Sequence, residues 1–117
     1  TPETKEACER YVEKLEECGY CVHWPIRDTE QDDPTLGVNI CDTNLSEILE
    51  SDEIHVWYLP ESTGIHFDMG AVYMLIRILG HKKKVIFANK DEFAKQITEK
   101  NTKAFFQVLN FLDKNTS

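Results

Sequence analysis

The sequence predicts a three-layer α/β fold, in which helices cover both faces of a parallel sheet. Short apolar runs of strand length alternate along the chain with longer segments whose apolar residues recur at helical spacing. The predicted order is helix, strand, helix, strand, helix, strand, helix, helix, which is typical of parallel sheets with right-handed crossovers. The chain has 117 residues, of which 41% are hydrophobic, and this suits one domain with its own core. We therefore expect residues 1–117 to form a single domain.

The first helix is predicted over residues 3–17. Thr1 offers a hydroxyl as the N-cap, and Pro2 takes the first helical position, where its missing N–H costs nothing. Gly19 is expected to end this helix, because glycine readily adopts the left-handed conformation of a C-cap.

A short strand is predicted next, over residues 20–24, and Pro25 closes it. Residues 26–40 are polar and are expected to form a long loop, which in a small domain is usually functional or mobile. Three strands make a thin sheet for so many helices, so we expect a further strand before Thr1, or an edge that is completed otherwise.

The remaining elements follow from the same periodicities. Asp42, Thr43 and Asn44 offer alternative caps for a helix through Leu45, Ile48 and Leu49. The other predicted elements are a strand at 54–59, a helix at 67–79 stopped by Gly80, a strand at 84–88, a helix at 90–100, and a last helix at 102–113 that buries Phe105, Phe106, Leu109 and Leu112.

Charge and composition exclude several classes of function. The net charge of −8 disfavours a nucleic-acid polymer as partner, because phosphate backbones are repelled. No apolar run approaches the roughly 20 residues that cross a bilayer, and neither a basic n-region nor the core of a signal peptide is visible, so we expect a cytoplasmic protein. Cys18 and Cys21 follow a helix end, where the dipole disfavours a thiolate, so we expect reduced structural cysteines, with no metal and no cofactor.

The segment Ser62-Thr-Gly-Ile-His-Phe-Asp-Met-Gly-Ala71 is the strongest candidate site. It joins a predicted strand to a predicted helix, where free N–H groups and the helix dipole favour anions. It supplies a hydroxyl (Ser62), a glycine that permits close approach (Gly64), an imidazole (His66) and a carboxylate (Asp68). The same residues also fit an ordinary capped helix start, and the sequence alone leaves both interpretations open.

This segment carries a resemblance to a known family. The run Asn44-Leu-Ser-Glu-Ile-Leu-Glu-Ser-Asp52, the strand 54–59 and then Ser62-x-Gly-x-x-Phe-Asp-Met-Gly-Ala resemble the nucleoside 2-deoxyribosyltransferase superfamily, which includes 2′-deoxynucleoside 5′-monophosphate N-glycosidases. The likeness spans about residues 4 to 90, and its specific part is 44–71. It implies a flavodoxin-like domain that cleaves or transfers at an N-glycosidic bond and needs no cofactor.

The resemblance assigns the chemistry to a carboxylate near the sugar C1′, because the transition state is positively charged. Asp68 stands where the family has its nucleophilic glutamate, and its side chain is one methylene shorter, a reach deficit of roughly 1.5 Å. Asn44 stands where the monophosphate hydrolases have an aspartate, and Asn cannot act as a base. Asp42 is the alternative if the helix start is shifted. Ser62 matches the serine that contacts the 5′-phosphate.

The remaining predicted contacts are less specific. Gly64 is expected to let a phosphate approach the backbone, and His66 to contact the phosphate or the leaving base, or else to lie exposed. Arg27 is a candidate phosphate or base contact, and Trp24 a candidate wall of the base pocket, although core or interface packing is the better explanation for Trp24.

Two functions are compatible with these residues. The first is an N-glycosidase or deoxyribosyltransferase-like enzyme acting on a nucleoside 5′-monophosphate. The second is a nucleotide-binding or sensing module that kept the fold and lost turnover, which the changes at positions 44 and 68 favour. The helix 67–79 is apolar over more than one face, so it needs cover on nearly all sides, and we expect a homodimer or larger assembly.

Overall fold

The computed structural model describes residues 1–100 and 104–116, with side chains described outside 97–106. Its contacts divide the chain into two compact units, Thr1–Glu47 and Ile48–Ser117. Among the described helices, none combines the length and the apolar character needed to cross a bilayer.

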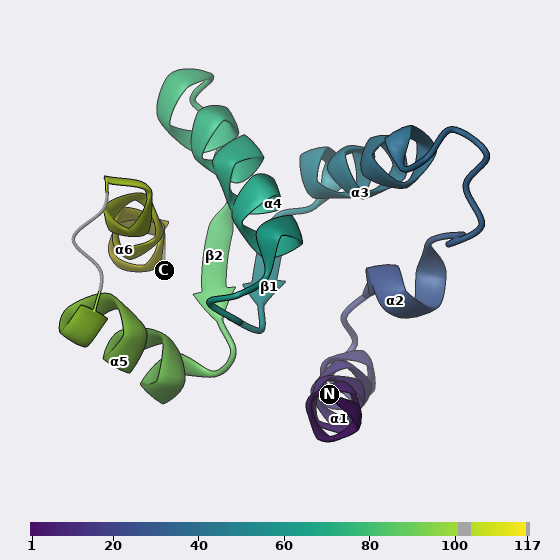
Figure 1. The fold of residues 1–117 in the computed structure, drawn as a ribbon, viewed down its shortest axis with the longest axis horizontal. Helices are drawn as coiled ribbons and strands as arrows, with labels where there is room; N and C mark the ends of the chain where they lie inside the picture. Colours follow the sequence, from purple (N-terminus) through teal and green to yellow (C-terminus); the bar gives the residue numbers. More distant parts are fainter. Residues whose placement is uncertain (101–103, 117) are drawn as a thin grey trace. The chain divides into compact units, whose positions relative to one another are not determined.

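The first unit begins with helix α1, Pro2–Glu17, as the sequence predicts (Figure 1). The Thr1 hydroxyl accepts a hydrogen bond from the Thr4 N–H at 3.2 Å, which satisfies one of the free donors of the first turn. After the helix end, Gly19 has φ +95°, a left-handed conformation that suits glycine. Local signals alone therefore place both ends of α1.

The predicted strand at 20–24 is wrong. This segment has no regular structure, and Trp24 is the N-cap of a short helix α2, Pro25–Asp28. Its backbone groups bond to side chains: the Asp28 carboxylate accepts from the Trp24 N–H at 2.7 Å, and Arg27 donates to the Val22 carbonyl at 3.1 Å. An apolar run of strand length thus forms no strand here, because side chains take bonds that a neighbouring strand would otherwise make.

Helix α3 spans Val38–Glu50 and starts earlier than predicted. Asp42 and Asn44 therefore lie inside the helix and not at its cap. The first turn is held instead by Asp33, whose carboxylate accepts from the Ile40 N–H at 2.9 Å, and by Thr35, whose hydroxyl accepts from the Asn39 N–H at 3.0 Å. The polar segment 26–40, predicted as a loop, supplies this cap and the first turn of α3.

The second unit contains the sheet. Strand β1, Glu53–Val56, pairs with strand β2, Lys84–Phe87, in parallel, as predicted for these two segments (Figure 1). Between them run helix α4, Thr63–Tyr73, and a π-helical turn η1, Met74–Ile78, and after β2 come α5, Lys90–Lys100, and α6, Ala104–Thr116. At the end of α3, the Lys83 ammonium donates to the carbonyls of Leu49 at 2.7 Å and Ser51 at 2.6 Å.

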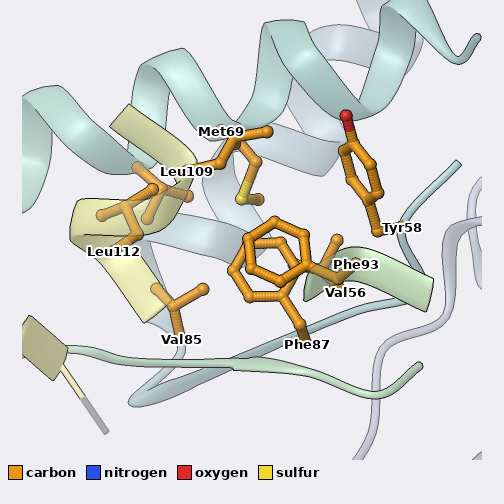
Figure 2. Close-up of a cluster of buried hydrophobic side chains, with 9 residues drawn as sticks. Val56, Tyr58, Met69, Val85, Phe87, Phe93, Leu109 and Leu112 are labelled. Atoms are coloured by element: carbon orange, nitrogen blue, oxygen red, sulfur yellow. The ribbon is translucent and has the colours of Figure 1, made fainter. Parts of the chain in front are cut away.

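One face of the sheet carries the core. The register pairs Ile54 with Val85 and Val56 with Phe87, so these four apolar side chains share a face. Helices α4, α5 and α6 bring the core residues Met69, Val72, Phe93, Leu109 and Leu112 to that face, and Tyr58 joins them from the segment after β1. Figure 2 shows Tyr58, Met69, Leu109 and Leu112 around the stacked rings of Phe87 and Phe93. The predicted burial of Leu109 and Leu112 is confirmed, and the prediction for Phe105 and Phe106 lies outside the described side chains.

The start of α4 differs from the prediction. The sequence indicates a helix from about residue 67, whereas α4 begins at Thr63 with Ser62 as its N-cap. The predicted site loop is therefore mostly the first two turns of α4. The helix continues through η1, and Gly80 at φ +72° follows its end, where the sequence predicts the stop.

The described residues thus form a mixed helical and strand structure around a two-stranded parallel sheet. The third predicted strand is absent from this sheet, and α4, α5 and α6 supply core residues that cluster with Val56, Val85 and Phe87 of the two strands.

Candidate functional site

The candidate site lies at the carboxyl end of β1, where the chain turns into α4. The turn is closed by a hydrogen bond from the Ser62 N–H to the Leu59 carbonyl at 3.0 Å. Beyond the last paired residues, the Asn89 side chain continues the ladder: its Oδ1 accepts from the Tyr58 N–H at 2.7 Å, and its Nδ2 donates to the Tyr58 carbonyl at 2.8 Å. We call this pair of hydrogen bonds between the Asn89 amide and the Tyr58 backbone the Asn89 clamp. It joins the carboxyl ends of β1 and β2, and the candidate site follows β1.

Ser62 caps α4, since its Oγ accepts from the Ile65 N–H at 3.2 Å. The hydroxyl proton of Ser62 can still be donated to a ligand. A Cβ placed on Gly64 would have Ser62 Oγ, at 3.9 Å, as its one neighbour within 4 Å, so the space beside this backbone is open. The N–H groups of the first helical turn have no partner within the helix, which makes this corner suited to an anion.

His66 is held between two groups of the protein. Its Nδ1 lies 2.6 Å from the Ser62 carbonyl oxygen, and its Nε2 lies 3.2 Å from the Tyr58 hydroxyl. The Tyr58 and His66 rings also meet edge to face, with centroids 5.6 Å apart. Both ring nitrogens of His66 already have partners in the protein, so a ligand that contacts His66 would have to displace one of them.

Tyr58 is fully buried, and Figure 2 shows its hydroxyl directed toward α4. Burial, followed by the nearby charge of Glu61, raises the pKa of its phenol. The hydroxyl therefore keeps its proton and needs an acceptor, which His66 Nε2 provides.

Asp68 is half-buried and occupies the sixth position of α4. The prediction that it lies at the helix N-terminus is wrong, because α4 starts at Thr63. Burial raises the pKa of the Asp68 carboxyl above its ordinary value of 3.8, which disfavours its ionised form. Five residues into the helix, desolvation outweighs the field of the helix terminus, which falls off within the first turn.

Asn44 and Asp42 belong to the first unit. The Asn44 Oδ1 accepts from the hydroxyl of buried Thr29 at 2.7 Å, and Thr29 Oγ1 lies 3.0 Å from His23 Nε2. The threonine hydroxyl donates its proton to Asn44, so it acts as the acceptor toward His23, whose Nε2 donates an N–H to it. Asn44 therefore closes a polar chain within its own unit, while Asp42 is exposed on α3.

Trp24 and Arg27 come together at a cleft of about 350 Å³ in the first unit, which Lys5, Glu9, Val12, Glu13 and Ile26 also line. The Arg27 guanidinium donates to both oxygens of Glu16, at 3.0 and 3.2 Å, and to Asp28 at 2.7 Å. These carboxylates raise the pKa of Arg27, and Arg27 in turn lowers the pKa of Asp28 to about 2. A phosphate at Arg27 would compete with two carboxylates already in place.

None of the family models, curated proteins or solved structures compared with the chain matches it. The family resemblance therefore depends on the motif residues alone.

Sequence reasoning missed two residues of this corner, Tyr58 and Asn89. Tyr58 was interpreted only as part of a buried strand, and Asn89 was not singled out. An asparagine directly after a strand, followed by a helix, is a recognisable cap signal, and the Asn89 carbonyl does accept from the Phe93 N–H at 3.0 Å. Its second role, bonding to Tyr58, depends on strand pairing and has no local signal. Within the described residues, no group of three or more His, Cys, Asp or Glu side chains is placed to hold a metal ion.

Proposed function

We propose that this protein cleaves or transfers at the N-glycosidic bond of a nucleoside 5′-monophosphate, with Asp68 as the carboxylate that acts at the sugar C1′. The observation that carries the proposal is the arrangement at the end of a parallel strand: Ser62 caps α4 beside the open backbone of Gly64, and Asp68 is half-buried further along the same helix. The proposal includes a complete flavodoxin-like three-layer sandwich and a cytoplasmic location.

The phosphate is assigned to the first turn of α4. Its N–H groups and the Ser62 hydroxyl supply donors to an anion, and the absence of a side chain on Gly64 allows phosphate oxygens close to the backbone. The net charge of −8 does not oppose this assignment, because local donors and the helix dipole act at contact distance.

Asp68 supplies the reacting group. A carboxylate near C1′ stabilises an oxocarbenium-like transition state and can form a glycosyl intermediate, which water or a second base then resolves. Partial burial suits this role, since it excludes water from the reacting centre, and the raised pKa means that the nucleophile is formed only above that pKa. We expect the rate of base release to increase with pH through the raised pKa of Asp68.

The test is release of free base from a panel of ribo- and deoxyribonucleoside 5′-monophosphates, measured by liquid chromatography. Asp68→Asn is expected to abolish release while nucleotide binding persists, because the charge is lost and the shape is kept. Asp91→Asn, at an exposed carboxylate of the same unit outside the motif residues, is the matched control and should leave release unchanged. Asp68→Glu restores the reach of the family's glutamate and should raise the rate. Absence of base release from every nucleotide by the wild-type chain would overturn the enzyme proposal.

A binding or sensing module is the second candidate function, and one observation favours it. Burial raises the pKa of Asp68, which opposes the ionised form that a nucleophile needs. Nucleotide binding at micromolar concentration, with no base release by the wild-type chain or by Asp68→Glu, is the result expected for this second function.

We further propose that the protein assembles as a homodimer through α4 and η1. The side chains of Phe67, Met74 and Ile78 are 57%, 54% and 68% exposed, although each is large and apolar. Covering them with a second copy would bury this surface. Sedimentation is expected to give a dimer at micromolar concentration for the wild-type chain and a monomer for Ile78→Glu, and a wild-type monomer would contradict the assembly.

A further inference from the structure

The pair formed by Tyr58 and His66 is the least expected feature of this corner. Tyr58 has no exposed surface, and its hydroxyl lies 3.2 Å from His66 Nε2, while His66 Nδ1 lies 2.6 Å from the Ser62 carbonyl oxygen. Neither contact was anticipated from the sequence, and neither is needed to form α4, whose backbone bonds and Ser62 cap are already present.

The proton positions in this chain follow from the chemistry of its ends. A carbonyl oxygen only accepts hydrogen bonds, so His66 Nδ1 must carry the proton that it shares with Ser62. In the neutral ring, Nε2 is then an acceptor, and the Tyr58 hydroxyl donates to it. The chain therefore runs in one direction, from the Tyr58 O–H through the imidazole to the Ser62 carbonyl.

The end of the chain is the peptide unit that opens α4. The Ser62 carbonyl belongs to the same planar group as the Thr63 N–H, the first N–H of the helix. The helical bond from the His66 N–H to this carbonyl is long, at 3.4 Å, whereas the imidazole contact is short. Hydrogen bonds in series polarise one another, so donation to the carbonyl strengthens the N–H of the same peptide as a donor.

We propose that His66 is a positioning residue, which the Ser62 carbonyl and the Tyr58 hydroxyl together hold as the Nδ1–H tautomer so that it orients and polarises the Ser62–Thr63 peptide toward a phosphate. This inference rests on the proposed phosphate subsite at the start of α4. It assigns His66 an action through the backbone and not by direct contact with the ligand. The Ser62 carbonyl requires the proton on Nδ1, and the Tyr58 hydroxyl supports this tautomer by donating to Nε2. Ser62 therefore caps the helix with its hydroxyl and accepts the imidazole hydrogen bond with its carbonyl.

The first experiment reads the tautomer in the unliganded protein by long-range ¹H–¹⁵N correlation of labelled histidine side chains. We expect the neutral His66 ring of the wild-type chain to have a protonated Nδ1 and an unprotonated Nε2. In Tyr58→Phe the donor to Nε2 is lost while the ring is kept, so the Nε2 resonance is expected to shift, while the Ser62 carbonyl continues to favour the proton on Nδ1. Tyr73→Phe, which removes a hydroxyl at the far end of α4, is the control and should leave the His66 signals unchanged. An Nε2–H tautomer in the wild-type chain would overturn the inference.

The second experiment measures inorganic phosphate binding from the amide shifts of Thr63 and Gly64. Tyr58→Phe is expected to weaken binding about fivefold, the equivalent of a net hydrogen bond of about 1 kcal/mol. His66→Asn places an amide N–H near the position of Nδ1 and should retain most of the affinity, whereas His66→Gln reaches the position of Nε2 and should not. A role in folding alone predicts no such difference between the Asn and Gln variants at equal stability.

The outcomes separate this inference from the proposed function. If the wild-type chain binds no phosphate, the phosphate subsite on which the proposed function and the role of His66 both depend is contradicted. The tautomer experiment then still tests the hydrogen bonds of His66. A wild-type chain that binds phosphate no more tightly than folded Tyr58→Phe and His66→Gln overturns the positioning role and leaves the proposed function standing.

Discussion

The two units of this chain are stabilised by different interactions. In Thr1–Glu47, all of which is described, Val12 is the one buried apolar side chain. Hydrogen bonds and ion pairs, such as those that Arg27 makes with Glu16 and Asp28, connect its other segments. In the described part of Ile48–Ser117, nine buried side chains form one cluster over the sheet: Val56, Tyr58, Met69, Val72, Val85, Phe87, Phe93, Leu109 and Leu112. Because the burial of apolar surface is the dominant stabilising force in folding, we expect the second unit to be the more stable part.

Truncation of a core side chain is expected to give the largest change in the free energy of unfolding. Leu112 is fully buried on α6, and Leu112→Ala is expected to lower the free energy of unfolding by about 2–5 kcal/mol, measured by urea denaturation. Val12→Ala in the first unit should cost about 1.5 kcal/mol, from the two methylene equivalents removed.

Leu36→Ala is the control for both variants, because Leu36 is 97% exposed, and its effect should stay within about 0.5 kcal/mol. An equal loss for Val12→Ala and Leu112→Ala would show that the two units are not stabilised differently.

The Asn89 clamp gives a polar test within the second unit. Asn89→Ala removes both partners of the Tyr58 backbone, and we expect a loss of about 1–3 kcal/mol in the free energy of unfolding. Asn89→Asp keeps the acceptor for the Tyr58 N–H but sets a carboxylate oxygen against the Tyr58 carbonyl, where the wild-type chain has a donor.

Amide hydrogen exchange locates this effect. Tyr58 N–H should exchange faster in Asn89→Ala, and Ala88 N–H, which bonds to the Val56 carbonyl at 2.7 Å, should change less. Equal loss of protection across both units would mean that Asn89 does not act locally.

The smallest expected effects are in the pH dependence of stability. Rising pH lowers the stability contribution of a carboxyl in the second unit and raises that of a carboxyl in the first. Burial raises the pKa of Asp68 in the folded state, so its contribution to stability is complete below the ordinary value of 3.8 and is lost as pH rises through the raised value. Arg27 lowers the pKa of Asp28 to about 2, so that contribution is present above 3.8 and is lost as pH falls toward 2.

Urea unfolding at a series of pH values checks both signs. Asp68→Asn should remove the loss of stability with rising pH, and Asp28→Asn should remove part of the loss with falling pH. Added salt should reduce the second effect more, because Arg27 and Asp28 are partly exposed, with side chains 39% and 27% accessible. A pH profile of Asp68→Asn parallel to that of the wild-type chain would contradict the role of burial.

Sequence patterns predicted those parts of the fold that depend on local chemistry. Thr1 and Pro2 mark the start of α1, and the apolar runs around Val56 and Val85 mark two strands that do pair in parallel. Residues 20–24 have the same strand-like pattern but find no strand to pair with, and periodicity alone cannot reveal that. Pattern reasoning also placed the start of α4 too late, because Gly64 in the first turn suggested a loop.

The position of the candidate site could be predicted from the sequence, but the burial and the contacts of its residues could not. Ser62, Gly64, His66 and Asp68 are close together because they are neighbours in the chain. The burial that raises the pKa of Asp68 is a tertiary effect, and so is the Asn89 clamp, which joins groups 31 residues apart. The Tyr58–His66 contact depends on the angle at which α4 leaves β1, and a linear sequence does not specify that angle.

The π-helical turn η1 has a consequence for how chains of this kind can change in length. In η1 the Leu79 N–H bonds to the Met74 carbonyl, a span one residue longer than in an α-helix. Deleting one residue between Met74 and Ile78 leaves a turn of ordinary α-helical pitch, whereas deleting one residue from β1 or β2 would turn the rest of that strand's side chains to the opposite face of the sheet. Insertions and deletions among related chains are therefore expected to collect in this turn, with the strands on either side unchanged in length.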